Sequence, residues 1–354
     1  MNKLSLKSKQ IENEVLRNYK ISSPSKLPLE SRKFFKNYFS RREKLFHDCL
    51  KLPKEVFKNK RLLDFGSGTG EHDILYAKWG SKLDLVEINP ISVAQTKKYF
   101  KFFKINKNIK RIENKSIFDF RPKNKYDIVV SEGVLHHVNN PYLGLQYLTK
   151  NLKKGGFCIL QLAFDFSHFQ RSLHRYIINY LKNNNSNINV EKICYKLFSE
   201  TINRANKFGG RSKKQIVYDF YTNPKHKGIN LRKLLIWFKK NKIKYYSSYP
   251  SIEPEGLING IHQNVTNEII MSFPSISLFQ SINFLLASAD DQVSLKKIIK
   301  LSSKNLKIWS NLMLKSKLDD IENKKKINKF NLKKNFNLYF KNLLNIYNVR
   351  NKSR

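Results

Sequence analysis

The sequence has few cysteines, few acidic residues and no long apolar segment. Its three cysteines, Cys49, Cys158 and Cys194, lie far apart and form neither a Cys-x-x-Cys pair nor a Cys/His cluster. This spacing predicts no disulfide framework and no metal site. No stretch approaches the roughly 18 consecutive apolar residues of a membrane span, and the first residues lack the apolar core of a signal peptide. We therefore expect a cytoplasmic protein without a membrane span.

The scarcity of acidic residues leaves a large excess of positive charge. The chain of 354 residues has 68 Lys and Arg and 27 Asp and Glu, a net charge of +41. A nucleic-acid-binding protein gathers such charge on one face. Here the lysines run from Lys3 to Lys352, and Lys, Asn, Ile, Phe and Tyr are abundant together, as AT-rich codons would produce. The charge permits an anionic partner without identifying one.

Three segments differ in their patterns. Residues 1–58 are typical of a helical, polar N-terminal cap, and residues 251–354 of a mostly helical, basic extension. Residues 59–250 alternate short apolar runs with amphipathic helical ones, interrupted by a helical insertion at about 168–212. This alternation predicts an α/β, Rossmann-like, doubly wound and mostly parallel sheet, with the insertion following its fifth strand.

Local signals place the strands and helix ends. Six runs predict strands: "RLLDF", "KLDLVEI", "IKRIEN", "YDIVVS", "GFCILQLA" and, after the insertion, "IKYYSSY". Asn-Pro pairs at 89–90 and 140–141 predict helix starts, as does Asn230. Gly80 and the pair Gly155-Gly156 predict helix ends.

A glycine-rich stretch, "LLDFGSGTG", follows the first predicted strand. Gly66, Gly68 and Gly70 would let the backbone pass close to a ligand at the start of a helix. Dinucleotide-binding loops have G-x-G-x-x-G, whose N–H groups face a pyrophosphate. This chain has D-x-G-x-G-x-G, and Asp64 would repel a pyrophosphate but suit an ammonium group, while a purely structural cap is the alternative role for that carboxylate.

Taken together with four further stretches in order, this loop resembles class I S-adenosylmethionine-dependent methyltransferases. The stretches are "LDLVEINP", "IENKSIFDF", "YDIVVSEGVLHHVNNP" and "LKKGGFCILQL", and a later one, "YDFYTNPKHKGINLRKLLIW", resembles a bacterial branch with a helical insertion. The resemblance implies S-adenosylmethionine as cofactor, Glu87 on the ribose, and Ser116 and Ile117 at the adenine. The full set of implied cofactor residues is Asp64, Gly66, Ser67, Gly68, Gly70, Glu87, Ile88, Ser116, Ile117 and Ser131.

Two adjacent histidines, His136 and His137, stand where the resemblance places the methyl donor and acceptor. Histidine titrates near neutral pH and can act as a base, but shaping or lining the site is an equal alternative, since alignment of the reactants supplies much of the rate. Candidate substrate contacts, each also explicable as an ordinary surface residue, are Glu132, His168, Arg171, Asp219 and Tyr221, with Arg175 and His226 nearby.

The resemblance thus implies methyl transfer, and a small-molecule acceptor is the leading hypothesis, although the resemblance does not supply the substrate. Transfer to RNA, such as tRNA, is a second hypothesis, although the chain lacks the Asp/Asn-Pro-Pro-aromatic turn and the Pro-Cys pair of base methylation. A non-catalytic module that binds the cofactor is a third, which the intact glycine loop and Glu87 disfavour. The sequence does not identify the acceptor atom or the oligomeric state.

Overall fold

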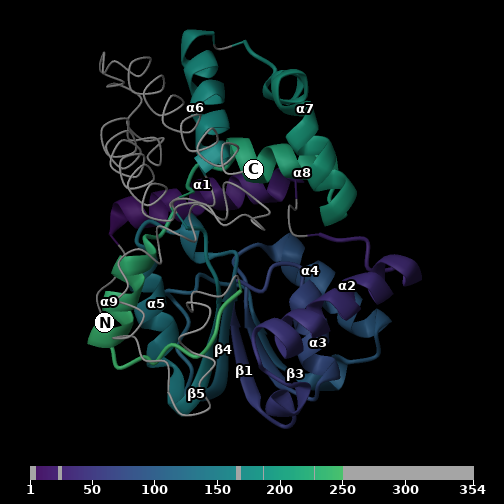
Figure 1. Ribbon diagram of the computed structural model, residues 1–354, viewed down its shortest axis with the longest axis vertical. Coiled ribbons are helices and arrows are strands. Elements are labelled where there is room, and N and C mark those ends of the chain that lie inside the picture. Colours follow the sequence, from purple (N-terminus) through teal and green to yellow (C-terminus); the bar gives the residue numbers. More distant parts are fainter. Residues whose placement is uncertain (1–4, 23–25, 165–168, 186, 227, 250–354) are drawn as a thin grey trace, which may run out of the picture. The chain divides into compact units, whose positions relative to one another are not determined.

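The computed structural model describes residues 5–22, 26–164, 169–185, 187–226 and 228–249 (Figure 1). The predicted C-terminal extension, residues 251–354, lies outside the described residues. The chain divides into two compact units, Met1–Ala163 with Leu173–Lys227, and Phe164–Ser172 with Gly228–Arg354. The division into three domains drawn from the sequence stays a prediction.

The first unit is built on five parallel strands in the order β3-β2-β1-β4-β5. Chain order runs outward from β1 to β3 on one side and from β4 to β5 on the other, so the order reverses between β1 and β4. In open α/β sheets, ligands bind outside the carboxyl ends of the strands at such a point. The strands are β1 Arg61–Phe65, β2 Lys82–Val86, β3 Ile109–Glu113, β4 Tyr126–Glu132 and β5 Leu152–Gln161.

Helices cover both faces of this sheet, as right-handed crossovers require when the strand order reverses (Figure 1). Helices α2, α3 and α4 lie on one face and α5 on the other. The predicted Rossmann-like fold with parallel strands is confirmed. The helical segments here are α1 Leu6–Ser22, α2 Arg32–Lys44, η1 Leu45–Cys49, η2 Lys54–Phe57, α3 Glu71–Lys78, α4 Pro90–Phe102, η3 Asn106–Asn108, η4 Leu135–His137 and α5 Pro141–Lys150.

Residues before the sheet contribute to its core. Phe46 and Phe57 are fully buried and pack on Tyr76 and Trp79, with ring centroids between 4.8 and 5.8 Å apart. Removal of a buried aromatic ring costs about 3–5 kcal/mol of stability. These residues before the sheet are therefore part of the folded unit, and Phe46 of η1 and Phe57 of η2 pack against α3 and the residue that follows it.

The predicted helix starts are confirmed by their hydrogen bonds. The side chain of Asn89 accepts from the N–H of Ile91 at 3.1 Å, and Asn140 accepts from the N–H groups of Tyr142 and Leu143. Each asparagine precedes a proline in the first turn, whose missing N–H costs nothing there. Asn230 likewise begins α9, Leu231–Lys240, in the second unit, and Gly80 follows the end of α3 with φ +92°.

The prediction that Gly155 and Gly156 end a helix is wrong. Helix α5 ends at Lys150, and both glycines lie inside β5, where its pairing with β4 shifts register. Gly155 has φ +76°, and a Cβ on Gly156 would meet the carbonyl oxygen of Asp127 at 2.6 Å. The glycines are needed for a bulge, because only they fit its backbone conformation and close approach.

The predicted sixth strand is also wrong. Residues 243–249 of the second unit are described and form no strand. Tyr246 and Tyr249 are 53% and 68% exposed, so this run does not bury one alternating face as a sheet strand would. Alternation in the sequence therefore predicted a strand that these described residues do not form.

The predicted helical insertion is confirmed, with α6 beginning at Phe169. Its part of the first unit has an apolar core that includes Ile178, Cys194, Ile202 and Tyr221. Within the described residues, no helix combines the length and apolar character needed to cross a bilayer. The helical segments of the insertion are α6 Phe169–Asn184, α7 Val190–Gly209, α8 Lys213–Val217 and η5 Tyr218–Thr222.

Candidate functional site

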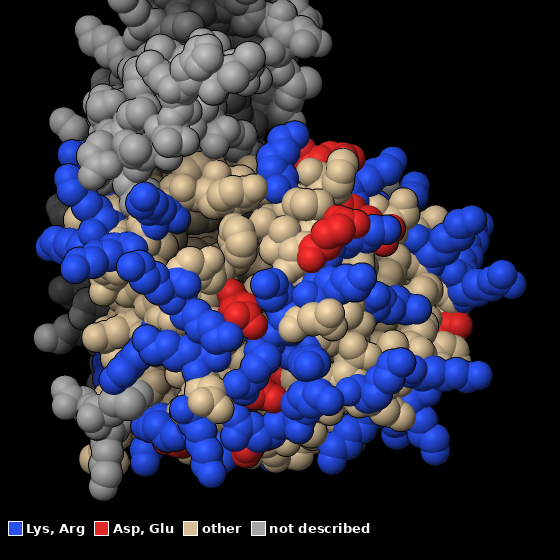
Figure 2. Space-filling model, turned by 90° about the horizontal axis from the view of Figure 1, so that it is seen from below, with Lys and Arg blue, Asp and Glu red and all other residues tan. Residues whose placement is uncertain are grey.

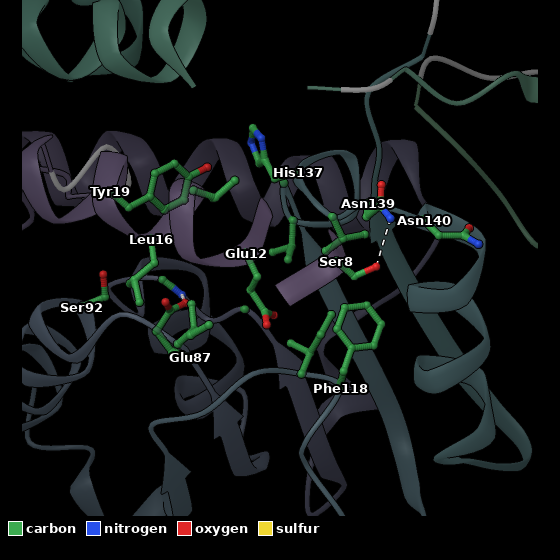
Figure 3. A pocket seen from close by; sticks show the side chains of 18 of the residues that line it. Ser8, Glu12, Leu16, Tyr19, Glu87, Ser92, Phe118, His137, Asn139 and Asn140 are labelled. Carbon is green, nitrogen blue, oxygen red and sulfur yellow. Dashed lines mark hydrogen bonds between the residues drawn. The ribbon is translucent and has the colours of Figure 1, made fainter. Parts of the chain in front are cut away.

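A pocket lies at the carboxyl ends of β1, β2 and β4, where the strand order reverses (Figure 3). Its floor comes from the loops that follow these strands, and α1 forms the opposite wall. Of the residues expected at a cofactor, the pocket brings together those from the glycine loop, the end of β2 and the segment after β3: Gly66, Gly68, Glu87, Ile88 and Ile117.

The glycine loop approaches the pocket because its backbone takes conformations that side chains disfavour. Gly66 and Gly68 have φ of +88° and +57°. A Cβ on Gly66 would overlap the side chain of Val134, which also lines the pocket. Glycine is therefore required at this position by both its φ and its surroundings. The loop ends at Gly70, which is the N-cap residue of α3.

Glu87, just beyond β2, places a carboxylate in the pocket (Figure 3). One of its oxygens accepts from the N–H of Gly68 at 2.9 Å and the other from the N–H of Asn89 at 2.7 Å. Burial raises the pKa of Glu87 to about 7, although these backbone hydrogen bonds counteract the effect. The carboxylate is thus held rigidly and retains lone pairs for a ligand's hydroxyl groups.

The expected adenine-binding segment contributes Ile117 to the pocket, whereas Ser116 is not among the lining residues. Ile117 and Phe118 line the pocket. The hydroxyl of Ser116 donates to Glu12 of α1 at 2.5 Å and accepts from the N–H of Phe118 at 3.1 Å. Ser116 therefore fixes the segment to α1.

Helix α1 lines the site with residues that the sequence patterns did not predict. Ser8, Glu12, Leu16 and Tyr19 line the pocket from successive turns of one helix face (Figure 3). Asn139, after η4, donates to the hydroxyl of Ser8 at 3.0 Å. The signal was a glutamate among apolar residues at helical spacing, which marks a face that covers something polar.

Asp64, expected to face an ammonium group, is not among the residues that line the pocket. Its side chain is buried near Asp73 of α3, whose carboxylate is also buried. Burial, and then the neighbouring negative charge, raises the pKa of Asp64, and burial also raises that of Asp73. Two neighbouring buried carboxyl groups do not readily ionise together. Its direct contact with a ligand stays a prediction.

The remaining residues of the expected cofactor set support the loops from behind. Ser131 is fully buried, and its hydroxyl donates to the carbonyl of Phe65 at 3.0 Å, joining β4 to the end of β1. Ser67 is buried within the glycine loop, and Gly70 packs against Thr96 of α4. None of these three is among the residues that line the pocket.

Glu132, a candidate substrate contact, is occupied by an ion pair. Arg42 of α2 donates to both of its oxygens at 2.7 and 2.8 Å, and the hydroxyl of Tyr76 donates to one of them at 2.6 Å. Burial alone would raise the pKa of Glu132, but the charge of Arg42 outweighs it and holds the pKa at about 2. Glu132 forms part of the pocket wall as a charge that Arg42 already neutralises.

His136 and His137 are both buried in η4, and only His137 lines the pocket. The Nδ1 of His137 lies 2.7 Å from the carbonyl oxygen of Lys225, and its ring meets Tyr19 of α1 edge-on. The ring centroids of His136 and His137 are 4.1 Å apart. A role for either histidine as a base stays a prediction.

Residues 38–206 match the family model described as a methyltransferase domain. These residues form a methyltransferase domain. The matched range spans the sheet, the glycine loop, Glu87 and both histidines, together with the first two helices of the insertion. A search by sequence found no matching curated protein.

Solved structures resemble this methyltransferase domain at low sequence identity. PKMT2 from Rickettsia typhi, in complex with AdoHcy, has 18% identity and a TM-score of 0.47, over 70% of this chain and 50% of that one. The PRMT1 enzyme–prozyme complex of Trypanosoma brucei with AdoHcy has 20% identity and a TM-score of 0.28, over 34% of this chain and 38% of that one. A putative S-adenosyl-L-methionine-dependent methyltransferase of Methanococcus maripaludis has 19% identity and a TM-score of 0.28, over 35% of this chain and 60% of that one. The matches thus span 38–60% of those chains.

The candidate substrate residues of the insertion do not line the pocket of the methyltransferase domain. Asp219 pairs with Arg211 at 2.8 Å, and Tyr221 is buried in the insertion core with its hydroxyl 3.3 Å from Nδ1 of His174. Arg175 is buried and donates to the carbonyl of Asn223 at 2.6 Å. Arg171 belongs to the second unit, and His168 lies outside the described residues.

Proposed function

We propose that this protein transfers the methyl group of S-adenosylmethionine to a small-molecule acceptor. The observation that carries the proposal is the position of Glu87, whose carboxylate faces a pocket at the switch between β1 and β4, beside Gly66 and Gly68. A carboxylate at the end of the second strand suits the two hydroxyl groups of a ribose.

The residues of the pocket fit this cofactor. Glu87 would accept hydrogen bonds from the ribose, Gly66 and Gly68 would admit the methionine part, and Ile117 and Phe118 offer apolar surface to the adenine. When bound, the cofactor supplies a methyl group on a positively charged sulfur, which is electrophilic without further activation. The protein's main task is then to align an acceptor and keep water out.

A small acceptor is supported by the way α1 covers the pocket. Asn18 of α1 donates to the carbonyl of Tyr218 at 3.0 Å and accepts from the hydroxyl of Thr222 at 3.0 Å, both in η5. Asn223 donates to the hydroxyl of Tyr19 at 3.3 Å. An acceptor that fits beneath α1 and η5 needs no rearrangement of these contacts, whereas a macromolecule would need to displace them.

Calorimetric titration with S-adenosylmethionine tests the cofactor assignment. Loss of hydrogen bonds to a charged group costs about 1.5–3 kcal/mol each, so Glu87→Ala should weaken binding at least about tenfold. Glu113→Ala is the matched control, because Glu113 ends the neighbouring strand β3 and does not line the pocket. Equal affinities for both variants would contradict the assignment.

The acceptor can be sought with labelled S-adenosylmethionine and a fractionated cell lysate. Label in the small-molecule fraction supports the proposal, and label confined to protein or RNA contradicts its acceptor class. The Glu87→Ala variant provides the background for this assay.

RNA is a second candidate acceptor because of one surface. Figure 2 shows a face on which Lys and Arg side chains spread widely, with few acidic groups between them. A polyanion would release counterions on binding such a face, so affinity for tRNA should fall steeply between low and physiological salt. Methylation of one tRNA species would support this candidate, and binding without methylation would reduce it to nonspecific attraction.

A further inference from the structure

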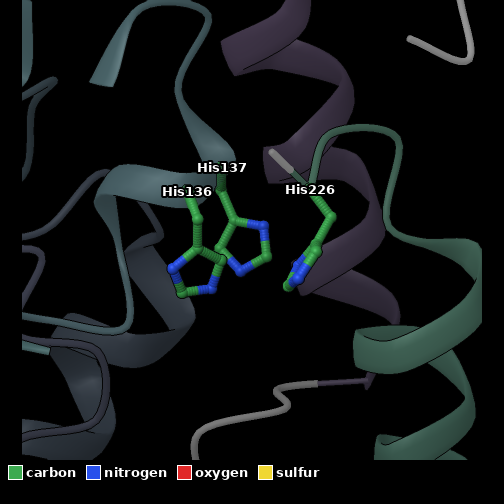
Figure 4. Close-up of side chains that lie close together, drawn as sticks. All are labelled: His136, His137 and His226. Atoms are coloured by element: carbon green, nitrogen blue, oxygen red, sulfur yellow. The ribbon is translucent and has the colours of Figure 1, made fainter. Parts of the chain in front are cut away.

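Three buried histidines from two remote segments meet beside the pocket (Figure 4). His136 and His137 belong to η4, and His226 follows η5 in the same unit. The ring centroids of His226 lie 4.9 Å from His136 and 5.5 Å from His137. One ring nitrogen from each residue lies within 4.8 Å of the other two. We propose that His136, His137 and His226 bind a divalent transition-metal ion such as Zn²⁺.

The hydrogen bond of His137 prepares that residue as a ligand. A carbonyl oxygen can only accept, so Nδ1 of His137 carries the proton that it donates to Lys225. The unprotonated nitrogen of this tautomer is then Nε2, the atom with which the ring would bind a metal ion. Histidines that bind metals characteristically donate their other N–H to a carbonyl or carboxylate, which fixes both the tautomer and the ring orientation.

The donor set selects the kind of ion. Neutral imidazoles suit Zn²⁺ and other borderline transition metals, whereas Mg²⁺ and Ca²⁺ prefer oxygen ligands. In the described part of the chain, the group contains no carboxylate or thiolate. Three histidines leave a fourth position of a tetrahedral ion open for water or another ligand. Because His137 also lines the pocket, an ion held here would border it.

The spacing of the rings is compatible with this site after a small adjustment. Zn–N bonds of about 2.0–2.1 Å place tetrahedral ligand nitrogens about 3.4 Å apart. Since the relevant nitrogens lie within 4.8 Å of one another, binding would draw the most distant pair together by up to about 1.4 Å. We therefore expect the metal to tie His226, and with it the segment after η5, to η4.

The test is metal binding by the full-length protein, independent of any methyl transfer. After dialysis against a chelator, titration with ZnCl₂ should show one tight site per chain. His226→Gln should weaken that site by at least about a hundredfold, because two imidazoles remain. His47→Gln is the matched control, since His47 is 74% exposed beside Asp48 and is a place where metal would bind adventitiously. Unchanged binding in His226→Gln, or loss in His47→Gln, would overturn the proposal.

A second measurement covers the case in which His226→Gln does not fold. Co²⁺ added to the wild-type protein should give the intense visible absorption of a tetrahedral nitrogen-bound ion, and Zn²⁺ should displace it. A weak octahedral spectrum, or none, would overturn the metal site. Calorimetry with S-adenosylmethionine on the metal-free protein reports separately on the proposed cofactor, so failure of one assignment is distinguishable from failure of the other.

Discussion

The titration of Glu87 makes cofactor binding depend on pH in a defined direction. Its pKa, raised by burial to about 7, lies well above the ordinary range of a glutamate. Ribose hydroxyl groups would donate to the ionised carboxylate, so binding favours the ionised form and releases a proton. Apparent affinity should therefore fall as the pH drops through 7 and level off above about pH 8.

The size of the effect follows from the fraction of Glu87 that is ionised. With a pKa of about 7, this fraction is about 0.1 at about pH 6 and about 0.9 at about pH 8. The dissociation constant for S-adenosylmethionine should thus be about tenfold larger at the lower pH, a difference of about 1.4 kcal/mol. Calorimetry in two buffers of different ionisation enthalpy should also detect close to one released proton near pH 6.

The matched control is another carboxylate in the same pocket. Burial also raises the pKa of Glu12, which lines the pocket from α1 and accepts from Ser116. Glu12→Gln should keep the tenfold dependence, and Glu87→Gln should bind weakly and almost independently of pH. A dependence that survives in Glu87→Gln, or disappears in Glu12→Gln, refutes the assignment to Glu87.

Three further predictions concern the walls of the site. Arg42→Met should destabilise the fold by about 3–5 kcal/mol in urea unfolding, because it leaves the charge of Glu132 buried and unpaired; the double variant with Glu132→Gln should regain part of this loss, and additivity would contradict the pairing. Gly66→Ala should abolish cofactor binding in calorimetry, while Gly209→Ala, an exposed helical position with open space around its Cβ, should bind normally. Asn18→Ala should raise the dissociation rate of the cofactor in stopped-flow measurements several-fold, because α1 loses both hydrogen bonds to η5; an unchanged rate would show that α1 does not retain the ligand.

Much of the fold could be predicted because its signals are local. The Asn-Pro pairs at 89–90 and 140–141 mark helix starts through bonds to residues two or three positions away. Glu87 could be placed near the glycine loop because a βαβ unit brings the carboxyl ends of adjacent parallel strands together. The glycine pair of β5 misled because a bulge and a helix end require the same residue for the same backbone conformation.

The contacts between remote segments could not be predicted in this way. Periodicity indicates which face of α1 is apolar, but it does not show that this face covers a pocket whose other residues begin more than forty positions further along the chain. The ion pair of Glu132 could not be predicted, because its partner Arg42 is remote in the sequence. Likewise, His226 is separated from His137 by nearly ninety residues, and only the path of the insertion brings the two imidazoles together. The residue types indicated which side chains could bind or ionise, whereas the contacts of each side chain depended on the tertiary fold.

The position of α1 also bears on how fast the protein can work. A ligand that leaves past this helix must break the contact of Glu12 with Ser116 and that of Ser8 with Asn139. The spent cofactor has the same nucleoside as the fresh one, so it would be held by the same floor and the same helix. The opening of α1 would then limit the turnover rate, so that release of the spent cofactor, and not methyl transfer, would be the slowest step of the catalytic cycle.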